Sequence, residues 1–218
     1  MNTYLPLHKQ RPSQLLFYGG SVEDEFNKAP PPIIEEPKSI ELDLMKKITD
    51  YLDEVERFPS KNPFTGKDDS RMTIFSKSMI GKDIQAFVFG KVRQYYVPKE
   101  KAIVDSSITK SGRYEELYSL LQKLIKIHNP DFKYTSIQIN KSVETDWHFD
   151  KGNVGLSYCL ALGNFTGGGV VVRLTPNKEK KYDNKNKWLY YDGHYLKHKS
   201  APSKGTRYAI IFYTIATK

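Results

Sequence analysis

The sequence predicts an α+β fold in which two N-terminal helices brace a β-rich half arranged as a barrel or jelly roll. Two observations predict this class. Apolar residues recur at helical spacing in residues 39–57 and 112–128. In residues 134–214 the period changes to two, as where Ile137 and Ile139 alternate with polar neighbours, and glycine-containing turns separate short apolar runs. Helical stretches that precede strands along the chain are typical of α+β proteins.

The composition suits one folded domain with an anionic partner. The chain has 218 residues, of which 39% are hydrophobic and 13% aromatic, and this is enough to fill a core. Its net charge of +9 and pI of about 9.3 favour a nucleic acid or an acidic membrane surface as partner. The same charge is also compatible with a basic protein that is merely soluble.

Two absences in the sequence indicate an intracellular setting. No run approaches the roughly twenty apolar residues that a membrane helix needs, and the N-terminus lacks an apolar signal core. The single cysteine, Cys159, excludes an intramolecular disulfide and lies in an apolar run, as expected of a buried structural thiol. We expect a protein of the cytoplasm or nucleus, or of a host cell, with no membrane partner.

Residues 1–38 are expected to be an arm and a proline-rich linker, and residues 39–218 a single domain. The prolines at 30–32 exclude a helix there and favour extended polyproline geometry. No internal repeat divides the rest of the chain.

Both predicted helices have recognisable ends. Ser39 is the expected N-cap of the first helix, and Pro59 closes it. Asn129-Pro130 ends the second helix, and His128 in its last turn is expected to be structural. We interpret the apolar stripes of both helices as core-packing surfaces.

A loop, two strands and a basic stretch are expected between the helices. Residues 60–71 have loop composition, whereas Met72–Phe75 and Ile84–Phe89 have strand composition. The stretch that follows interleaves basic residues with tyrosines, namely Lys91, Arg93, Tyr95 and Tyr96. Such a pattern favours either a nucleic-acid groove, with stacking and phosphate contacts, or a half-buried edge strand.

A second basic stretch, residues 177–187, is expected to be an exposed hairpin loop between two core strands. It consists almost entirely of polar and charged residues. Its Lys178, Lys180 and Lys181 would contact phosphates if the loop lies near an active-site mouth, and are otherwise a solvated face.

His148 and Asp150 are the first candidates for chemistry. They are two residues apart, so on an extended segment both side chains project from the same face. An imidazole and a carboxylate at this spacing are two corners of the facial triad that binds non-haem Fe(II), and the third corner is a histidine. The chain offers His198 on a later strand, with His194 as a rival that follows the turn signal Asp192-Gly193.

Arg207 is the candidate for holding an anionic ligand. It follows His198 by nine positions and precedes an apolar run, Tyr208–Tyr213. A buried arginine there needs an anionic partner, and a guanidinium pairs bidentately with a carboxylate. The alternative is an arginine exposed at the start of the strand.

The ordered set of H-x-D, a glycine-rich turn at Thr166–Gly169 and H-x8-R resembles the 2-oxoglutarate/Fe(II) dioxygenases. The resemblance implies a double-stranded β-helix core at about 134–214, braced by the N-terminal helices. It also implies Fe(II) and 2-oxoglutarate as cofactors, with O2 as co-substrate. By the same resemblance the metal ligands and catalytic residues are His148, Asp150 and His198, and the clamp for 2-oxoglutarate is Arg207. Tyr158 or Asn140 is expected to hydrogen-bond the cofactor, because both lie on strands that should face the cavity.

A narrower resemblance is to the TET/J-binding-protein class of nucleic-acid-base dioxygenases. Asp150–Gly155 matches the D-x-x-N-x-G segment of that class, and Leu162–Gly168 is similar to its L-G-D-F-T-G-G segment. Asn164 and Gly169 stand where the class has Asp and Glu. This resemblance implies oxidation of the methyl group of 5-methylcytosine or thymine in DNA or RNA, of which DNA is favoured, with a base in a duplex flipped out of it.

Two other functions stay open. The H-x8-R spacing also suits hydroxylases that act on a protein side chain, of the prolyl type, or on a small molecule. A non-enzymatic β-barrel binding module is the third possibility, against which the complete set of three ligands and an arginine argues. Trp147 is expected to point away from His148 into the core, not to stack on a base.

Overall fold

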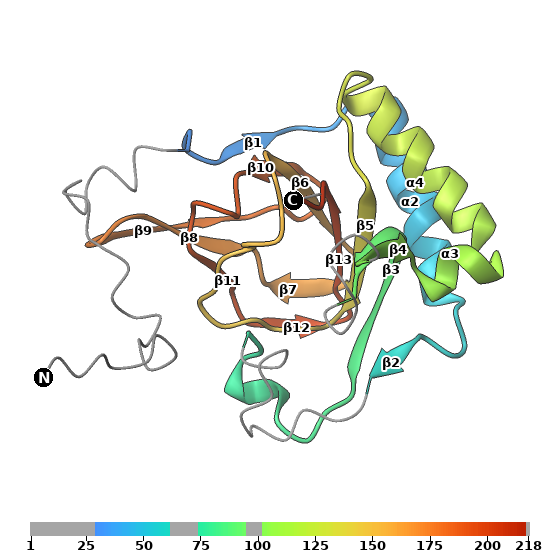
Figure 1. The fold of residues 1–218 in the computed structure, drawn as a ribbon, viewed down its shortest axis with the longest axis horizontal. Coiled ribbons are helices and arrows are strands. Elements are labelled where there is room, and N and C mark those ends of the chain that lie inside the picture. Colours follow the sequence, from blue (N-terminus) through green and yellow to red (C-terminus); the bar gives the residue numbers. More distant parts are fainter. Residues whose placement is uncertain (1–28, 62–73, 95–101, 217–218) are drawn as a thin grey trace, which may run out of the picture.

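The computed structural model describes residues 29–61, 74–94 and 102–216, and its fold is the predicted α+β class (Figure 1). From β5 onward the chain alternates between two antiparallel sheets. It crosses from β5 to a segment beside β11, returns to β6, crosses to β8 and β9, returns to β10, crosses to β11 and returns to β13. This path is a double-stranded β-helix, which confirms the predicted core.

Within the described residues the larger sheet has eight strands, in the order β1-β10-β6-β13-β5-β3-β2, with β4 paired to β3. Every pairing in it is antiparallel. The strands are β1 (Ile33–Glu35), β2 (Ser60–Lys61), β3 (Ile84–Arg93), β4 (Ile103–Asp105), β5 (Ser136–Lys141), β6 (Ser157–Leu162), β10 (Trp188–Tyr191) and β13 (Tyr208–Tyr213).

The smaller sheet has the order β11-β8-β9 and faces the larger one across a cavity. A separate pair of short strands, β12 and β7, lies beside it (Figure 1). These strands are β7 (Phe165–Gly167), β8 (Val170–Thr175), β9 (Lys178–Tyr182), β11 (His198–Ser200) and β12 (Ser203–Gly205).

The helices cover only one face of the larger sheet. Helices α2 (Ser39–Asp53) and α4 (Glu115–His128) lie side by side there, near the short α3 (Ser107–Ser111), while Lys77–Met79 forms a 3-10 helix elsewhere (Figure 1). Their apolar faces and alternate residues of the strands form one core, which includes Leu44, Ile48, Leu52, Leu117, Leu121, Leu124, Phe87, Phe89, Ile137, Ile139, Leu160, Tyr208, Ile210 and Phe212. Each of these large side chains contributes roughly 2 kcal/mol by its burial. The uncovered face of the sheet is left to line the cavity.

The helix ends differ by a few residues from the prediction. Lys38, not Ser39, is the N-cap of α2, because the Glu41 carboxylate accepts the backbone N–H of Lys38 at 2.5 Å. The second helix begins at Glu115 and not at 112, because Gly112 and Tyr114 adopt left-handed conformations that interrupt the helical hydrogen bonds.

The first helix also ends earlier than predicted. It stops at Asp53 and does not reach residue 57. The hydroxyl of Tyr208 contacts this end, donating to the Leu52 carbonyl at 3.1 Å and to the Asp53 carboxylate at 2.8 Å. A side chain from β13 therefore occupies the Leu52 carbonyl, an acceptor that a continued helix would use.

Several local expectations are corrected by strand pairing. Ser60–Lys61, expected in a loop, forms β2 against β3. In place of the strand expected at Met72–Phe75, Phe75 forms an isolated bridge to Thr145, while residues 62–73 lie outside the described residues. The basic stretch expected as a loop contains β9, which pairs with β8. Of residues 1–38, positions 33–35 form β1 at the edge of the larger sheet, and 1–28 lie outside the described part.

A buried polar cluster joins α2, α4 and the sheet. Glu41 is fully buried, and its carboxylate accepts the indole N–H of Trp188 at 3.0 Å. The His128 ring stacks on Trp188 with ring centres 4.4 Å apart, and its Nδ1 lies 3.2 Å from Glu41. His128 is thus a structural residue, as expected. No helix in the described part of the chain has the length and apolarity needed to cross a membrane.

Candidate metal centre

A cavity of about 330 Å³ lies between the two sheets. The larger sheet contributes the side chains on its uncovered face, and the smaller sheet contributes β11 and the segment beside it. Its lining includes Phe75, Gln138, Asn140, His148, Asp150, Asn153, Cys159, Asn184, Tyr191, His198, Arg207 and Tyr213.

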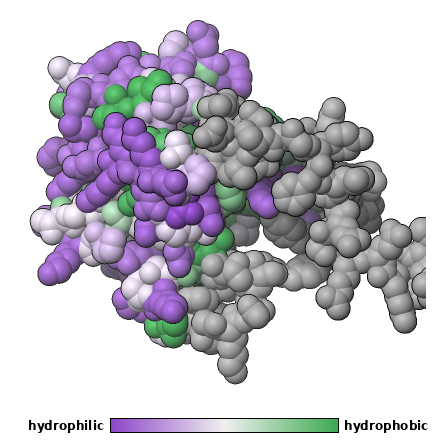
Figure 2. Space-filling view, turned by 90° about the vertical axis from the view of Figure 1, so that its left-hand side faces the viewer, coloured by the Kyte–Doolittle hydropathy of each residue, from purple (hydrophilic) through white to green (hydrophobic). Residues whose placement is uncertain are grey.

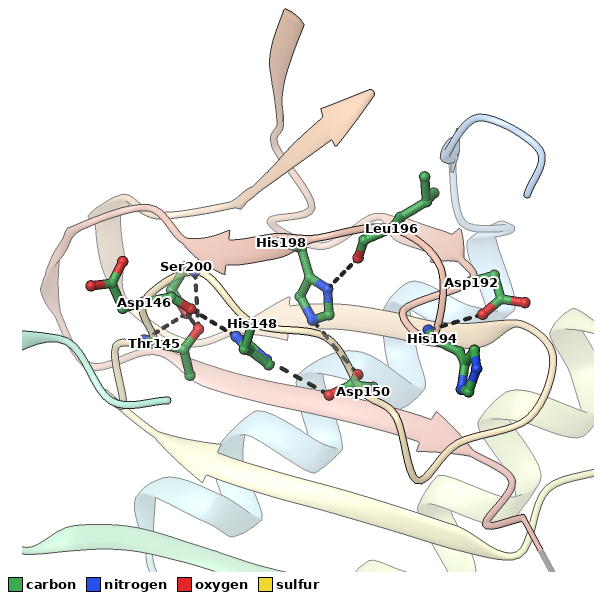
Figure 3. A network of polar contacts seen from close by, with 9 residues as sticks. All are labelled: Thr145, Asp146, His148, Asp150, Asp192, His194, Leu196, His198 and Ser200. Carbon is green, nitrogen blue, oxygen red and sulfur yellow. Dashed lines mark hydrogen bonds and ion pairs between the residues drawn. The ribbon is translucent and has the colours of Figure 1, made fainter. Parts of the chain in front are cut away.

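His148, Asp150 and His198 converge at one end of this cavity (Figure 3). Nε2 of His148 lies 3.7 Å from Oδ1 of Asp150, and Nε2 of His198 lies 3.6 Å from Oδ2. Two donor atoms that each lie about 2.1 Å from one ion are at most about 4.2 Å apart, so both separations allow a shared ion. Two imidazoles and one carboxylate on one side are the donor set of a non-haem Fe(II) site.

Both imidazoles are held in the orientation that a metal ligand needs. Nδ1 of His148 lies 2.7 Å from the Asp146 carbonyl, and Nδ1 of His198 lies 2.9 Å from the Leu196 carbonyl. A carbonyl can only accept, so each Nδ1 carries the proton and each Nε2 presents its lone pair to the cluster. Burial lowers the pKa of His198, and the Asp150 carboxylate offsets only part of this effect. His198 is therefore neutral at pH 7 and able to bind a cation.

Gly193 fits closely behind the cluster. A Cβ at this position would lie 2.8 Å from Oδ2 of Asp150 and 3.1 Å from Cε1 of His198. The Gly193 carbonyl also accepts the backbone N–H of Asp150 at 2.8 Å. The Asp192-Gly193 turn recognised in the sequence thus supports the back of the centre, where only glycine leaves room.

His194 does not join the cluster. Its backbone N–H donates to the Asp192 carboxylate at 2.9 Å, and its ring contacts Tyr195. In Figure 3 the ring lies to one side of the three converging residues. Of the two histidines considered from the sequence, the structure brings only His198 to His148 and Asp150.

Arg207 lies in the same cavity, just before β13. The residue is 5% exposed, and its Nη1 is buried without a hydrogen-bond partner among the described residues. Burial lowers the pKa of Arg207, opposed by the Glu144 carboxylate, but a guanidinium remains charged at neutral pH. The Glu144 oxygens accept from Ser78 and from the backbone of Ser203. The cavity therefore contains a cation that lacks a full set of acceptors.

The two cofactor helpers expected from the sequence fall on different faces of the larger sheet. Asn140 lines the cavity. Tyr158 was also expected to line the cavity, and this expectation is wrong. Its side chain belongs to the core beneath the helices, where it stacks on Tyr190 and accepts a hydrogen bond from Asn129 at 2.9 Å. Cys159, its neighbour on β6, faces the cavity instead. Burial raises the pKa of the Cys159 thiol, which stays protonated.

The expected nucleic-acid residues lie on two separate strands. Lys178, Lys180 and Lys181 are exposed on β9. This strand lies at the left of Figure 1, the side that Figure 2 turns to the viewer and shows as mainly hydrophilic. Lys91 on β3 forms an ion pair with Asp105 at 2.9 Å. In the same strand Arg93 donates to the carbonyl of Ala216. Tyr95 and Tyr96 lie outside the described residues.

Trp147 is not in the core, contrary to expectation. It is half-buried, with the guanidinium carbon of Arg173 4.6 Å and Nζ of Lys199 4.7 Å from its ring centre. The reason is that its neighbours His148 and Asp150 point into the cavity, so Trp147 points to the outer face of the smaller sheet. That face carries the cations of β8 and β11.

Sequence reasoning missed Asn184, which lines the cavity and is 3% exposed. Its Oδ1 is buried without a hydrogen-bond partner within the part of the chain that the structure describes. The only signal in the sequence is an asparagine inside a basic stretch, and this does not distinguish it from exposed neighbours such as Asn186.

Neither a protein-family model nor a curated protein sequence matches this chain significantly. Among solved structures it is similar to OsALKBH1, with 13% identity over 85% of this chain and 98% of that one, at a TM-score of 0.49. It is also similar to a prolyl hydroxylase from Trichoplax adhaerens solved with a hypoxia-inducible-factor peptide. The identity is 14% over 89% of this chain and 87% of that one, at a TM-score of 0.48. A third similar structure is NgTET1 in complex with 5mC DNA, with 13% identity over 84% of this chain and 70% of that one, at a TM-score of 0.49. Because the identities are this low, the function of the chain has to be argued from its own residues.

Proposed function

We propose that the protein is an Fe(II)- and 2-oxoglutarate-dependent dioxygenase that oxidises the methyl group of a pyrimidine base in nucleic acid. The observation that carries the enzymatic part is the composition of one cavity. It holds three ligands of a facial triad and, just before the last strand, a buried guanidinium with a donor that is unused among the described residues. These are the groups that an iron ion and a dicarboxylic 2-oxo acid require.

The roles of the residues follow from their positions. His148, Asp150 and His198 would hold the ion from one side and leave its other positions to ligands from the cavity. Arg207 would bind the carboxylate of 2-oxoglutarate that lies farthest from the ion. When bound, Fe(II) and 2-oxoglutarate supply the chemistry that converts a C–H bond and O2 to C–OH, with succinate and CO2 as the other products.

The proposed substrate rests on charge and on one segment beside the metal ligands. The chain carries a net charge of +9, and β9 presents exposed lysines that suit a phosphate backbone. Asn153, part of the segment that resembles the base dioxygenases, lines the cavity next to Asp150. An amide there can hydrogen-bond the edge of a base that has been flipped from a duplex, and we favour DNA over RNA.

Mass spectrometry of nucleosides tests this proposal. The full chain is incubated with Fe(II), 2-oxoglutarate and DNA or RNA that contains 5-methylcytosine, with the Asp150→Ala variant as control. We expect hydroxymethyl nucleosides, formed together with succinate, for the wild type only. If succinate forms in the presence of protein or small-molecule substrates but no base changes, the substrate is a protein side chain or a small molecule. If 2-oxoglutarate is not consumed with any substrate, the enzymatic proposal is wrong.

A further inference from the structure

A row of small side chains leaves space on the face of the larger sheet that lines the cavity. Ala86 on β3 pairs with Asn140 on β5, and Asn140 pairs on its other side with Ala209 on β13. Ala209 in turn pairs with Ala161 on β6. Directly opposite residues of antiparallel strands point to the same face, so the three alanines leave space above this row. Ala86, Asn140 and Ala209 accordingly line the cavity.

Asn184 closes one end of this row. Its backbone carbonyl accepts the N–H of Ala161 at 3.0 Å, which places the residue beside the last alanine. Its side chain lines the cavity and is 97% buried, yet Oδ1 has no hydrogen-bond partner among the described residues. Buried amides in folded proteins are nearly always hydrogen-bonded, and a half turn of this amide exchanges Oδ1 for the NH2 group. The position can therefore donate to an acceptor that the chain itself does not supply.

Arg207 borders the same end of the row. It precedes Ala209 by two residues on an extended chain, so its side chain projects from the same face of the sheet. Within the described part of the chain, its Nη1 is the other buried side-chain atom of this cavity wall that has no hydrogen-bond partner. A guanidinium and an amide with unused hydrogen-bonding capacity thus border one space, and a carboxylate accepts hydrogen bonds from both.

We propose that Asn184 is the second contact, beside Arg207, for the far carboxylate of the 2-oxo acid. It thereby determines specificity for a dicarboxylic co-substrate. The inference rests on the function proposed above. The amide NH2 of Asn184 donates to one oxygen of this carboxylate, while the guanidinium of Arg207 donates to both of its oxygens. A 2-oxo acid without that carboxylate, such as pyruvate, leaves both groups unpaired.

The test is calorimetric binding of 2-oxoglutarate and of pyruvate to the full chain with Mn(II) and without O2, so that no turnover occurs. Asn184→Asp places a negative charge of nearly equal volume where the amide donates, and we expect 2-oxoglutarate to bind at least about tenfold more weakly. Asn184→Ala removes the donor alone, and we expect a loss of about fivefold. Pyruvate binding is expected to be the same in all three proteins.

Asn186→Asp is the matched control, because Asn186 is exposed two residues along the same connection and the substitution adds the same charge. Unchanged 2-oxoglutarate binding in Asn184→Asp and Asn184→Ala overturns the inference and leaves the proposed function standing. Equal losses of affinity for 2-oxoglutarate and for pyruvate also overturn the inference, because Asn184 would then determine the shape of the cavity and not contact the far carboxylate. If Asn184→Asp does not fold, Asn184→Ala decides by the same criteria. A wild type that binds Mn(II) but no 2-oxoglutarate overturns both proposals.

Discussion

His148 and His198 lie directly opposite one another on neighbouring antiparallel segments, and each donates its backbone N–H to the other's carbonyl at 3.0 Å. Their ring centres are 4.3 Å apart. The two imidazoles of the candidate metal centre are therefore brought together by main-chain pairing. A slip of one residue in this register would turn one imidazole to the outer face, so the pairing itself specifies the site.

Removing one ligand should strongly weaken metal binding while leaving the fold intact. We expect Asp150→Ala to weaken Mn(II) binding roughly a hundredfold or more, because loss of a ligand exceeds the tenfold to hundredfold cost of losing a supporting partner. The Asp150 side chain is 31% exposed, so its truncation leaves no large buried void. Calorimetry measures the metal affinity, circular dichroism the fold and succinate release the turnover.

His194→Ala is the control for this experiment, since His194 lies four residues before His198 but outside the cluster. We expect it to bind metal as the wild type does. Undiminished turnover in Asp150→Ala, or a loss in His194→Ala that matches it, would show that the centre is assembled from other residues.

Arg207 should control the requirement for 2-oxoglutarate. A hydrogen bond to a charged group is worth about 1.5–3 kcal/mol, so Arg207→Ala should weaken 2-oxoglutarate binding roughly tenfold to a hundredfold. Arg207→Lys should rescue only part of this loss, because an ammonium cannot pair bidentately. Titration of 2-oxoglutarate in the presence of Mn(II) distinguishes the three proteins. The same affinity in all three would place the carboxylate elsewhere.

The features that could be predicted from the sequence depend on local periodicity. Both long helices follow from apolar residues at helical spacing, and only their ends were misplaced. The pair His148 and Asp150 follows from the two-residue repeat of a strand. Linking them to His198 required the order of residues in a resembling family, since no local pattern specifies which later strand pairs with the segment at 148.

The errors arise where both faces of a strand are buried. All six residues of β6 are buried, so no polar face marks which side meets the cavity. The sequence therefore does not show that Tyr158 lies beneath the helices and not in the cavity. Strand alternation correctly turns Trp147 away from His148, but it does not show that the opposite face carries two cations and not the core. Asn184 could not be recognised, because its burial depends on contacts with β6 that are distant in sequence.

His128 should make stability depend on pH. Burial lowers its pKa, and Glu41 and Glu35 oppose this only in part. A histidine whose pKa is lower in the folded state binds fewer protons there than in the unfolded chain. Stability is then fully present above the ordinary pKa of about 6.5 and is lost as pH falls below it. Urea unfolding should show a loss at pH 5.0 relative to pH 7.5 of at most about 2 kcal/mol from this residue.

His128→Phe isolates this contribution, because it keeps an aromatic ring against Trp188 and removes the titrating group. All other titrating groups are common to both proteins, so the difference in pH dependence belongs to His128. A wild type that instead gains stability relative to the variant between pH 7.5 and 5.0 would show that His128 is charged against Glu41.

The lysines of β9 should contribute to nucleic-acid affinity without reading its sequence. Lys178, Lys180 and Lys181 are exposed, and contacts from lysine to phosphate carry no base information. Replacing all three by glutamine should weaken binding about equally for all DNA sequences. It should also reduce the slope of log K against log salt by about 2 to 3, since each phosphate contact contributes about 0.9.

The matched control replaces three exposed lysines of the helical side, Lys47, Lys123 and Lys126, by glutamine. These lie on α2 and α4, across the molecule from β9 (Figure 1). The control removes the same net charge, so a local contact and a general charge effect give different results. If both triple variants change the salt slope equally, β9 makes no specific contact and only the overall charge attracts the nucleic acid. Affinity for 2-oxoglutarate should be unchanged in both, because its proposed site is enclosed and depends on Arg207.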